Sequence, residues 1–222
     1  MALGLPQSSG GSGDRSAVLK YDARAGRLFR VDRAQDSAGN WVNTPVEITR
    51  TFQAVIDIEQ IETGWLHFPK AAAPDMRLVP IGQPLPDKPS NDHRAGFRVM
   101  MKLGKDCGGD VREMASNAGV SIAGMDVLHD AYTKGVAANP GKLPVVVLKD
   151  TVAVKSQGQE TTSTNYQPVW DIVKWIDRPA ELPLRGAPPV AANEGKAQPV
   201  AQARTTSQTV EEAAPADDAD QF

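Results

Sequence analysis

The chain has 222 residues, enough for one domain of ordinary size and some additional segments. Its 24 basic residues nearly balance its 27 acidic ones, but residues 186–222 carry six acids and two bases, a net charge of −4. The single cysteine, Cys107, excludes an intramolecular disulfide and favours a reducing compartment. We see no signal peptide and no run of about 18 apolar residues, so we expect a soluble intracellular protein without a membrane span.

The first part of the chain predicts short strands. Residues 1–16 are rich in glycine and serine and predict a flexible segment. Residues 18–21 and 27–31, separated by a short turn, predict a strand pair or hairpin. From 46 to 58 the apolar side chains fall mainly on even positions, a period of two that predicts one half-buried strand. Residues 65–68 predict another short strand.

The middle of the chain begins with a proline-rich stretch. Six prolines between residues 69 and 90 exclude a regular helix and a central strand, so we expect a long surface connection. Residues 97–103 then predict a strand with Phe97, Val99 and Met101 on one face and Arg98 and Lys102 on the other.

Two helices and further strands are expected next. Asp110 and Glu113 fit a capping box, and a helical stripe follows to a stop at Gly119. A second stripe, from Met125 to Val136, ends at residues 139–141. Strands resume at 143–148, 151–155 and 166–176. We therefore expect a mainly-β domain, a small barrel or sandwich with a two-helix insertion.

The composition changes again near the end of the chain. Residues 186–222 contain no Leu, Ile, Trp or Tyr and are rich in Ala, Pro and Gln. Such a segment buries too little apolar surface to offset the entropy of ordering, so we expect disorder. The predicted organisation is a flexible segment at 1–16, a folded domain at 17–185 and a disordered linker with an acidic tip at 186–222.

No pattern typical of a catalytic or metal site emerges. His67, His93 and His129 are scattered and lack the spacing of a zinc site, and Cys107 has no neighbouring histidine in sequence. The glycines near residues 135–142 differ in spacing from a phosphate-binding loop and fit a helix stop before a strand. We therefore expect no enzyme, no metal and no cofactor.

Two basic clusters suggest a surface for a polyanion. Residues 15–33 have a net charge of +4, and residues 94–105 contain four basic residues and no acid. If the strand at 97–103 extends back to Arg94, then Arg94, Arg98 and Lys102 share one face. Cations spaced in this way can follow a phosphodiester backbone. The alternative interpretation is a solvated sheet face.

Two tryptophans are candidates for stacking on nucleic-acid bases. Trp41 lies in a polar segment, and Trp170 shares a predicted strand face with Lys174. Bases stack on exposed aromatic rings, so we expect these two rings to be exposed, whereas Trp175 is expected in the core. The alternative for each tryptophan is burial in the core.

The end of the chain resembles that of a known family. Asp217, Asp218, Asp220 and Phe222 follow a spacer rich in Gln, Pro and Ala, as in bacterial and phage single-stranded DNA-binding proteins. In that family an OB-fold core precedes a low-complexity linker and an acidic tip ending in Pro-Phe. Here Gln221 replaces the proline, and Asp220 replaces the preceding hydrophobic residue. The resemblance implies an OB-like small barrel and a tip that binds replication or recombination proteins.

We therefore expect a non-catalytic single-stranded DNA-binding protein of a phage or mobile-element replication or recombination module, in the cytoplasm of a bacterial host cell. The alternative is a β-sandwich structural or virion-assembly protein with a solubilising acidic tail. The oligomeric state stays open, a homo-oligomer included. The predicted DNA-contacting residues are Arg27, Arg30, Trp41, Arg50, Arg94, Arg98, Lys102, Lys105, Trp170 and Lys174.

Overall fold

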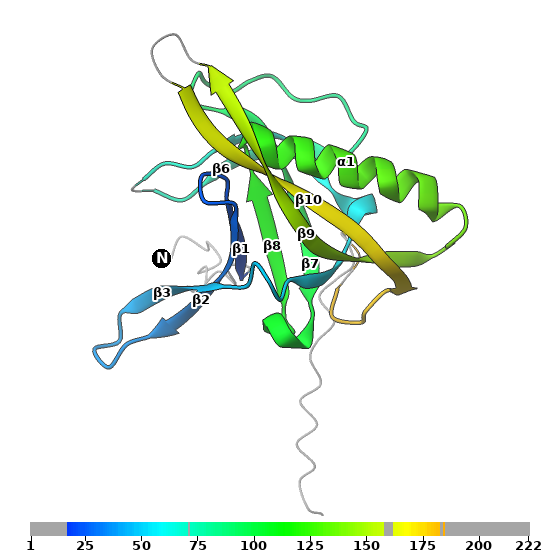
Figure 1. Cartoon of the computed structure of the whole chain (residues 1–222). Coiled ribbons are helices and arrows are strands. Elements are labelled where there is room, and N and C mark those ends of the chain that lie inside the picture. Colours follow the sequence, from blue (N-terminus) through cyan, green and yellow to red (C-terminus); the bar gives the residue numbers. More distant parts are fainter. Residues whose placement is uncertain (1–16, 71, 158–161, 183, 185–222) are drawn as a thin grey trace, which may run out of the picture. The chain divides into compact units, whose positions relative to one another are not determined.

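The computed structural model describes residues 17–70, 72–157, 162–182 and 184, and these belong to one compact unit (Figure 1). Of the described residues, 52% are in strands and 15% in helical turns, which confirms the mainly-β class. The predicted flexible segment at 1–16 and the tail at 186–222 lie outside the described residues. The elements in chain order are β1 (Val18–Asp22), β2 (Arg27–Gln35), β3 (Trp41–Glu47), β4 (Gln53–Ile56), the 3-10 turn η1 (Ile58–Gln60), β5 (Glu62–His67), β6 (Asp75–Pro80), β7 (Arg94–Leu103), the 3-10 turn η2 (Lys105–Cys107), β8 (Val111–Ser116), α1 (Gly119–Val136), β9 (Lys142–Gln157) and β10 (Thr162–Asp177).

The strands form one ten-stranded mixed sheet. Its main path runs β10-β9-β4-β7-β8-β1-β2-β3, and β5 joins β7 and carries β6. β4 and β5 pair with different parts of β7, namely residues 101–103 and 94–98. Neighbouring strands are antiparallel, except that β1 and β8 are parallel.

The strand ladders of the described residues do not close into a barrel. The turn between β1 and β2 instead reaches β10. The backbone N–H of Tyr166 donates to the carbonyl of Ala23 at 2.7 Å, and the Tyr21 hydroxyl donates to the carbonyl of Tyr166 at 2.9 Å. Gly26, with φ of 65°, permits this approach, because an added Cβ would lie 3.0 Å from the Cβ of Tyr166.

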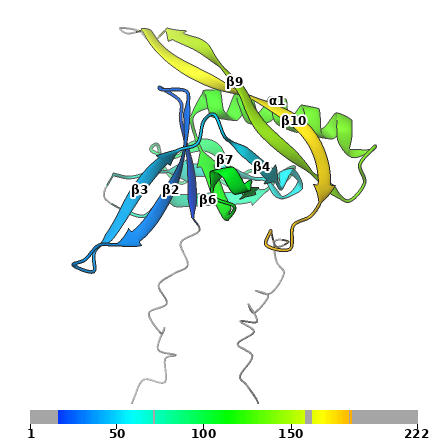
Figure 2. The same ribbon diagram turned by 60° about the horizontal axis from the view of Figure 1, so that its bottom comes forward.

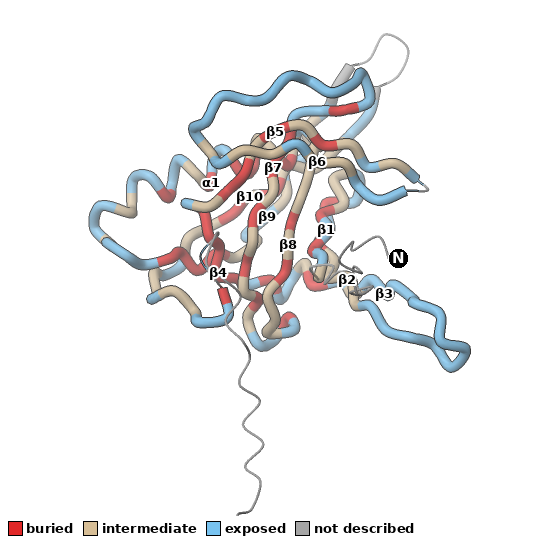
Figure 3. Tube along the Cα trace, turned by 180° about the vertical axis from the view of Figure 1, so that it is seen from behind, coloured by how far each residue is buried: buried red, intermediate tan, exposed pale blue. Residues whose placement is uncertain are grey.

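The main core cluster is made of side chains from the strands and from α1. Leu19, Leu28, Val99, Met114 and Leu128 are buried there to 1% exposure or less. Each such side chain contributes roughly 1.5–3 kcal/mol through burial. In Figure 3 the buried positions gather on the central strands and α1, whereas the far end of β2 and β3 is exposed throughout.

Several predicted elements are confirmed. β1 and β2 form the expected hairpin, and β7 shows the expected alternation of buried and half-buried residues. The stripe from Met125 to Val136 belongs to α1, which packs against β10 (Figure 1). Gly124 makes this packing close, since a Cβ there would lie 2.7 Å from Pro168.

The predicted helix at 110–119 is wrong. Residues 111–116 form strand β8 between β7 and β1, and Gly119 begins α1 instead of ending a helix. Arg112 and Met114 are buried while Val111 and Glu113 are only half-buried, which is the period of a strand. A segment of six residues is too short to distinguish the period of a helix from that of a strand. Pairing with β7 on one side and β1 on the other favours the strand.

The predicted single strand at 46–58 is also wrong. β3 ends at Glu47, and the chain turns through Arg50 before β4 begins. The buried Ile48 and Phe52 flank this corner, so the even-numbered apolar pattern continues through a turn.

Two further expectations are corrected. The proline-rich connection contains β6, which pairs only with β5 and so stays at an edge, where proline is tolerated. The two strands expected at 143–148 and 151–155 are one strand, β9, because a shift in register at Val169/Trp170 of β10 accommodates the extra residue, Lys149.

Candidate nucleic-acid interface

β2 and β3 form a two-stranded ribbon that extends away from the core (Figure 2). A tight turn at residues 36–40 closes it. The Asp36 carboxylate accepts hydrogen bonds from the backbone N–H groups of Asn40 and Ala38, at 2.8 and 2.9 Å, and Gly39 has φ of 82°. These hydrogen bonds, of which the one from the Asn40 N–H contributes most, lower the pKa of Asp36.

The strand register divides the side chains of β1, β2 and β3 between two faces. Leu19, Tyr21 and Leu28 lie on the inner face and are buried in the core. Their strand neighbours therefore point away from the core. We call this outward side the ribbon face; its basic and aromatic members are Lys20, Arg27, Phe29, Arg33 and Trp41.

Trp41 is the most exposed aromatic ring described on this face. Its exposed fraction is 55%, and the guanidinium carbon of Arg33 lies 4.6 Å from the ring centroid. This cation–π contact helps to hold the indole in place. A flat exposed ring next to a cation is the arrangement on which a base can stack while its phosphate meets the positive charge.

The inner end of the ribbon face carries further charges. Lys20 is exposed and lies opposite Phe29 in the register, and no acidic group among the described residues comes within 4.0 Å of its ammonium. Arg27 forms an exposed ion pair with Glu47 at 3.2 Å. Arg27 and Arg50 line one shallow, mostly polar depression, so these two predicted residues lie near each other.

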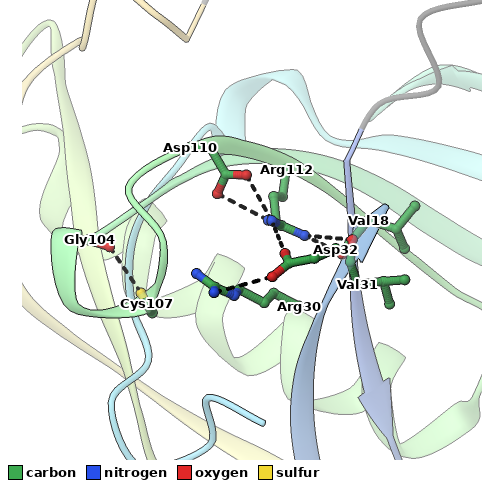
Figure 4. Close-up of polar contacts among 8 residues, drawn as sticks. All are labelled: Val18, Arg30, Val31, Asp32, Gly104, Cys107, Asp110 and Arg112. Carbon is green, nitrogen blue, oxygen red and sulfur yellow. Dashed lines mark hydrogen bonds and ion pairs between the residues drawn. The ribbon is translucent and has the colours of Figure 1, made fainter. Parts of the chain in front are cut away.

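Arg112 anchors the base of the ribbon (Figure 4). Its buried guanidinium donates to the carbonyls of Val31 and Val18, at 2.8 and 3.3 Å, and to the carboxylates of Asp32 and Asp110, at 2.6 and 3.0 Å. Burial disfavours its charge, but the hydrogen bonds to the two aspartates and their negative charges outweigh this and raise the pKa of Arg112. One side chain thus joins β1, β2 and β8.

Arg30, a predicted DNA contact, belongs to this anchor rather than to the ribbon face. It lies on the inner side of β2 and pairs with Asp32 at 3.2 Å, as Figure 4 shows. It also packs on the backbone at Gly108, where an added Cβ would lie 2.5 Å from its Nη1. Its side chain is only 26% exposed.

The predicted cationic stripe of β7 exists, but two of its three cations are paired with acids. Arg98 contacts the buried Glu62 and also Glu113, and Lys102 pairs with Glu181 at 3.2 Å. Arg94 is exposed at the start of the strand. Cations already neutralised in this way are weaker phosphate ligands. The fourth basic residue of the cluster, Lys105, is exposed in η2.

The exposure predicted for Trp170 is wrong. The residue is 8% exposed, and its ring centroid lies 5.4 Å from that of Phe52 in the core. A shift in register between Ile172 and Lys174 reverses the alternation of β10, so Lys174 is exposed on the other side. Trp175 packs beside Tyr132, at 5.4 Å between centroids, against the core as expected.

Sequence reasoning recognised the basic cluster at 15–33 but did not select Lys20 and Arg33. The alternation of β1 contains the signal for Lys20, which lies between the buried Leu19 and Tyr21, whereas the neighbours of Arg33 are not buried and mark no face. It missed Arg112 because the segment was interpreted as a helix. The predicted tip residues Asp217, Asp218, Asp220 and Phe222 lie outside the described residues.

Another polar cluster precedes β7. The Ser90 Oγ lies 2.9 Å from the Nδ1 of the buried His93, and an Asp75 carboxylate oxygen lies 3.3 Å from its Nε2. Ser90 Oγ also accepts the backbone N–H of Asp92 at 3.3 Å. These contacts fix the turn that leads into β7.

Within the described ranges, no three His, Cys, Asp or Glu side chains gather to hold a metal ion. No helix in the same part of the chain is long and apolar enough to cross a membrane. Comparison of the chain with protein-family models, curated proteins and solved structures finds no match.

Proposed function

We propose that this protein binds single-stranded DNA without catalysing a reaction, and that the ribbon face is its main contact surface. The observation that carries the proposal is the exposed ring of Trp41, held beside Arg33 on a ribbon that extends from the core. Large rings are mostly buried, so an exposed one on a polar ribbon indicates a contact surface.

The ribbon face provides both kinds of contact that a single strand needs. Lys20 and Arg33 attract phosphates, and Phe29 and Trp41 offer aromatic surface to bases. From the level of Phe29 to that of Trp41 the face extends six residues along β2, about 20 Å at the rise of a strand. Neither type of contact reads a base sequence, so the expected binding depends on salt and tolerates many sequences.

The order of the strands supports an OB-like core. β4 with its continuation β5, then β7 and β8, then α1, then β9 and β10 correspond to five barrel strands with a helix between the third and the fourth. In an OB barrel the third and fifth strands meet. In this chain β1 pairs with β8 in that position, and its turn contacts β10.

The acidic tip completes the proposal. Asp217, Asp218 and Asp220 offer carboxylates to a basic pocket, and Phe222 offers an apolar ring, on a replication or recombination protein. We place this activity in a phage or mobile-element module within a bacterial host cell.

The proposal is tested with fluorescently labelled oligo(dT) and two single variants. Trp41→Ala removes the exposed ring, whereas Val42→Ala changes its exposed neighbour on the opposite face of the ribbon. We expect W41A to weaken binding about 5- to 150-fold, from a stacking energy of about 1–3 kcal/mol. V42A should bind as the wild type does, and both variants should unfold at the same urea concentration as the wild type. Equal affinity of W41A and V42A would overturn the assignment of the ribbon face.

A further inference from the structure

A second candidate site lies away from the ribbon, between α1, β5, β7 and the segment that follows β6. It is a cavity of about 370 Å³. This volume lies at the lower end of the range of small-ligand sites, roughly 300–1,000 Å³. Much of its lining is apolar, with contributions from Ile61, Ile81, Phe97, Ile122 and Met125.

A few polar groups also line the cavity. Asp126 and His129 stand one helical turn apart on α1, and Thr63 and Gln83 come from the opposite elements. Asp126 is the only Asp, Glu, Lys or Arg among the lining residues, and no basic side chain in the described part of the chain lies within 4.0 Å of its carboxylate. Asp126 is an exposed residue, so its carboxylate offers acceptors to a flat, apolar-faced ligand that brings N–H donors, and it disfavours a negatively charged one.

We infer that this cavity takes one guanine base of the bound strand, an inference that rests on the proposed function. Guanine presents two adjacent donors, N1–H and the 2-amino group, which match the two oxygens of the Asp126 carboxylate. Its O6 and N7 are acceptors for the amide of Gln83 or the hydroxyl of Thr63. Thymine places carbonyls on both sides of its single N–H, and these would face the carboxylate.

The outer wall of the cavity is suited to admitting a base. It includes Gln83 and Leu85, in a segment whose residues are exposed from 82 to 92. The Trp65 indole N–H holds this segment by donating to the carbonyl of Pro86 at 2.7 Å, and the ammonium of Lys88 lies 5.6 Å from the centroid of the same ring. Lys88 thus brings a positive charge to this wall for the phosphate that flanks the base.

The test compares two oligonucleotides on the full chain, oligo(dT) and the same oligo(dT) with a single central dG. One dG per strand prevents quadruplex formation. We expect the dG strand to bind the wild type roughly 5- to 50-fold more tightly, the discrimination typical of one bidentate base contact. Asp126→Asn should abolish this preference. Asp130→Asn, one turn further on α1 and outside the cavity lining, should keep it. Circular dichroism checks that both variants are folded.

Saturation-transfer NMR with free guanosine and thymidine provides a readout that does not depend on strand binding. We expect saturation transfer from the wild type to guanosine and none to thymidine. The transfer to guanosine should be weaker with D126N and unchanged with D130N. If the wild type binds both oligonucleotides equally and guanosine receives no transfer, the guanine site is refuted while the proposed function stands. If the wild type binds neither oligonucleotide, the proposed function is refuted. In that case the presence or absence of saturation transfer to guanosine still shows whether the cavity binds guanine.

Discussion

Trp41 and Trp170 differ in what surrounds them, although the sequence made both of them candidates for stacking on bases. The Trp41 ring lies beside Arg33 at the protein surface, whereas Trp170 packs on Phe52 inside the sheet. The same residue type therefore has two roles, set by the face of the strand on which it lies.

Trp170→Ala should destabilise the protein instead of weakening DNA binding selectively. Removing a buried aromatic ring leaves a cavity and costs about 3–5 kcal/mol of unfolding free energy. Urea denaturation measures this loss, with W41A as the control that should unfold like the wild type. A W170A protein as stable as the wild type would contradict the burial.

Ionisation of Tyr21 should lower the stability of the folded protein at alkaline pH. Burial, together with the charge of Asp22, raises its pKa from 10.0 to about 12. Because the unfolded tyrosine ionises near 10, the stabilisation is complete below that pH and is lost as the pH rises toward 12. Tyr21→Phe removes the titrating group, so its unfolding free energy should fall less steeply between pH 9 and 11.5. Identical pH profiles from urea titrations of the two proteins would contradict the raised pKa.

At the scale of elements, the ribbon depends on one buried side chain. Arg112, on β8, donates to one carbonyl of β1, which pairs with β8, and to one of β2, which pairs with β1. The ribbon beyond it is exposed on both faces from residue 33 to residue 45. Its orientation relative to the core is therefore set mainly at its base.

Arg112→Met should loosen the ribbon. The variant removes the Arg112 donor from Asp32, Asp110 and two carbonyls. Asp32 keeps its ion pair with Arg30 and both carboxylates are partly exposed, so we expect a cost of about 1–3 kcal/mol. Arg112→Lys keeps the charge but not the planar fork, so we expect an intermediate loss. Hydrogen exchange should show faster exchange of the β2–β3 amides in R112M. Arg24→Met, at an exposed turn, is the control; equal exchange rates in R112M and R24M would refute the anchor.

The sequence is informative where the alternation of a strand is regular. In β7 the buried Phe97, Val99 and Met101 and their outward neighbours follow a strict period of two, so the faces were predictable. In β10 the shift in register between Ile172 and Lys174 interrupts that period, and no local signal marks it. The burial of Trp170 could therefore not be derived from spacing.

Partners distant in sequence limited the prediction of the candidate site. Arg98 lies 36 residues from Glu62, and Lys102 lies 79 residues from Glu181. A count of charges over a short stretch of sequence includes these cations, but it does not include the distant carboxylates that the fold brings next to them. The same limit hid Arg112, whose partner Asp32 lies 80 residues away.

At the scale of the whole molecule, the acids at the end of the chain oppose the proposed binding. Residues 211–222 contain five acids and the terminal Phe222. These charges are covalently linked to the proposed DNA-binding part, so we expect them to compete with DNA at a high effective concentration. Deleting residues 211–222 should tighten oligo(dT) binding several-fold at low salt, and the difference should shrink as salt screens the charges.

A matched control separates charge from length in that experiment. A chain of full length with the five acids replaced by Gln and Asn should bind oligo(dT) as tightly as the truncated chain does. If the truncation leaves the low-salt affinity unchanged, the tail does not compete with DNA.

Contact between the ribbon face and the phosphate backbone is tested most directly by the dissociation constant for oligo(dT) over a range of salt concentrations. We expect a steep loss of affinity with salt in the wild type, and a slope smaller by about 1.4 in Lys20→Ala/Arg33→Ala, roughly 0.7 for each lost contact. Lys134→Ala/Lys142→Ala, two exposed lysines outside the ribbon, should keep the wild-type slope. Equal slopes for the two double variants, or no binding by the wild type at low salt, would contradict the account.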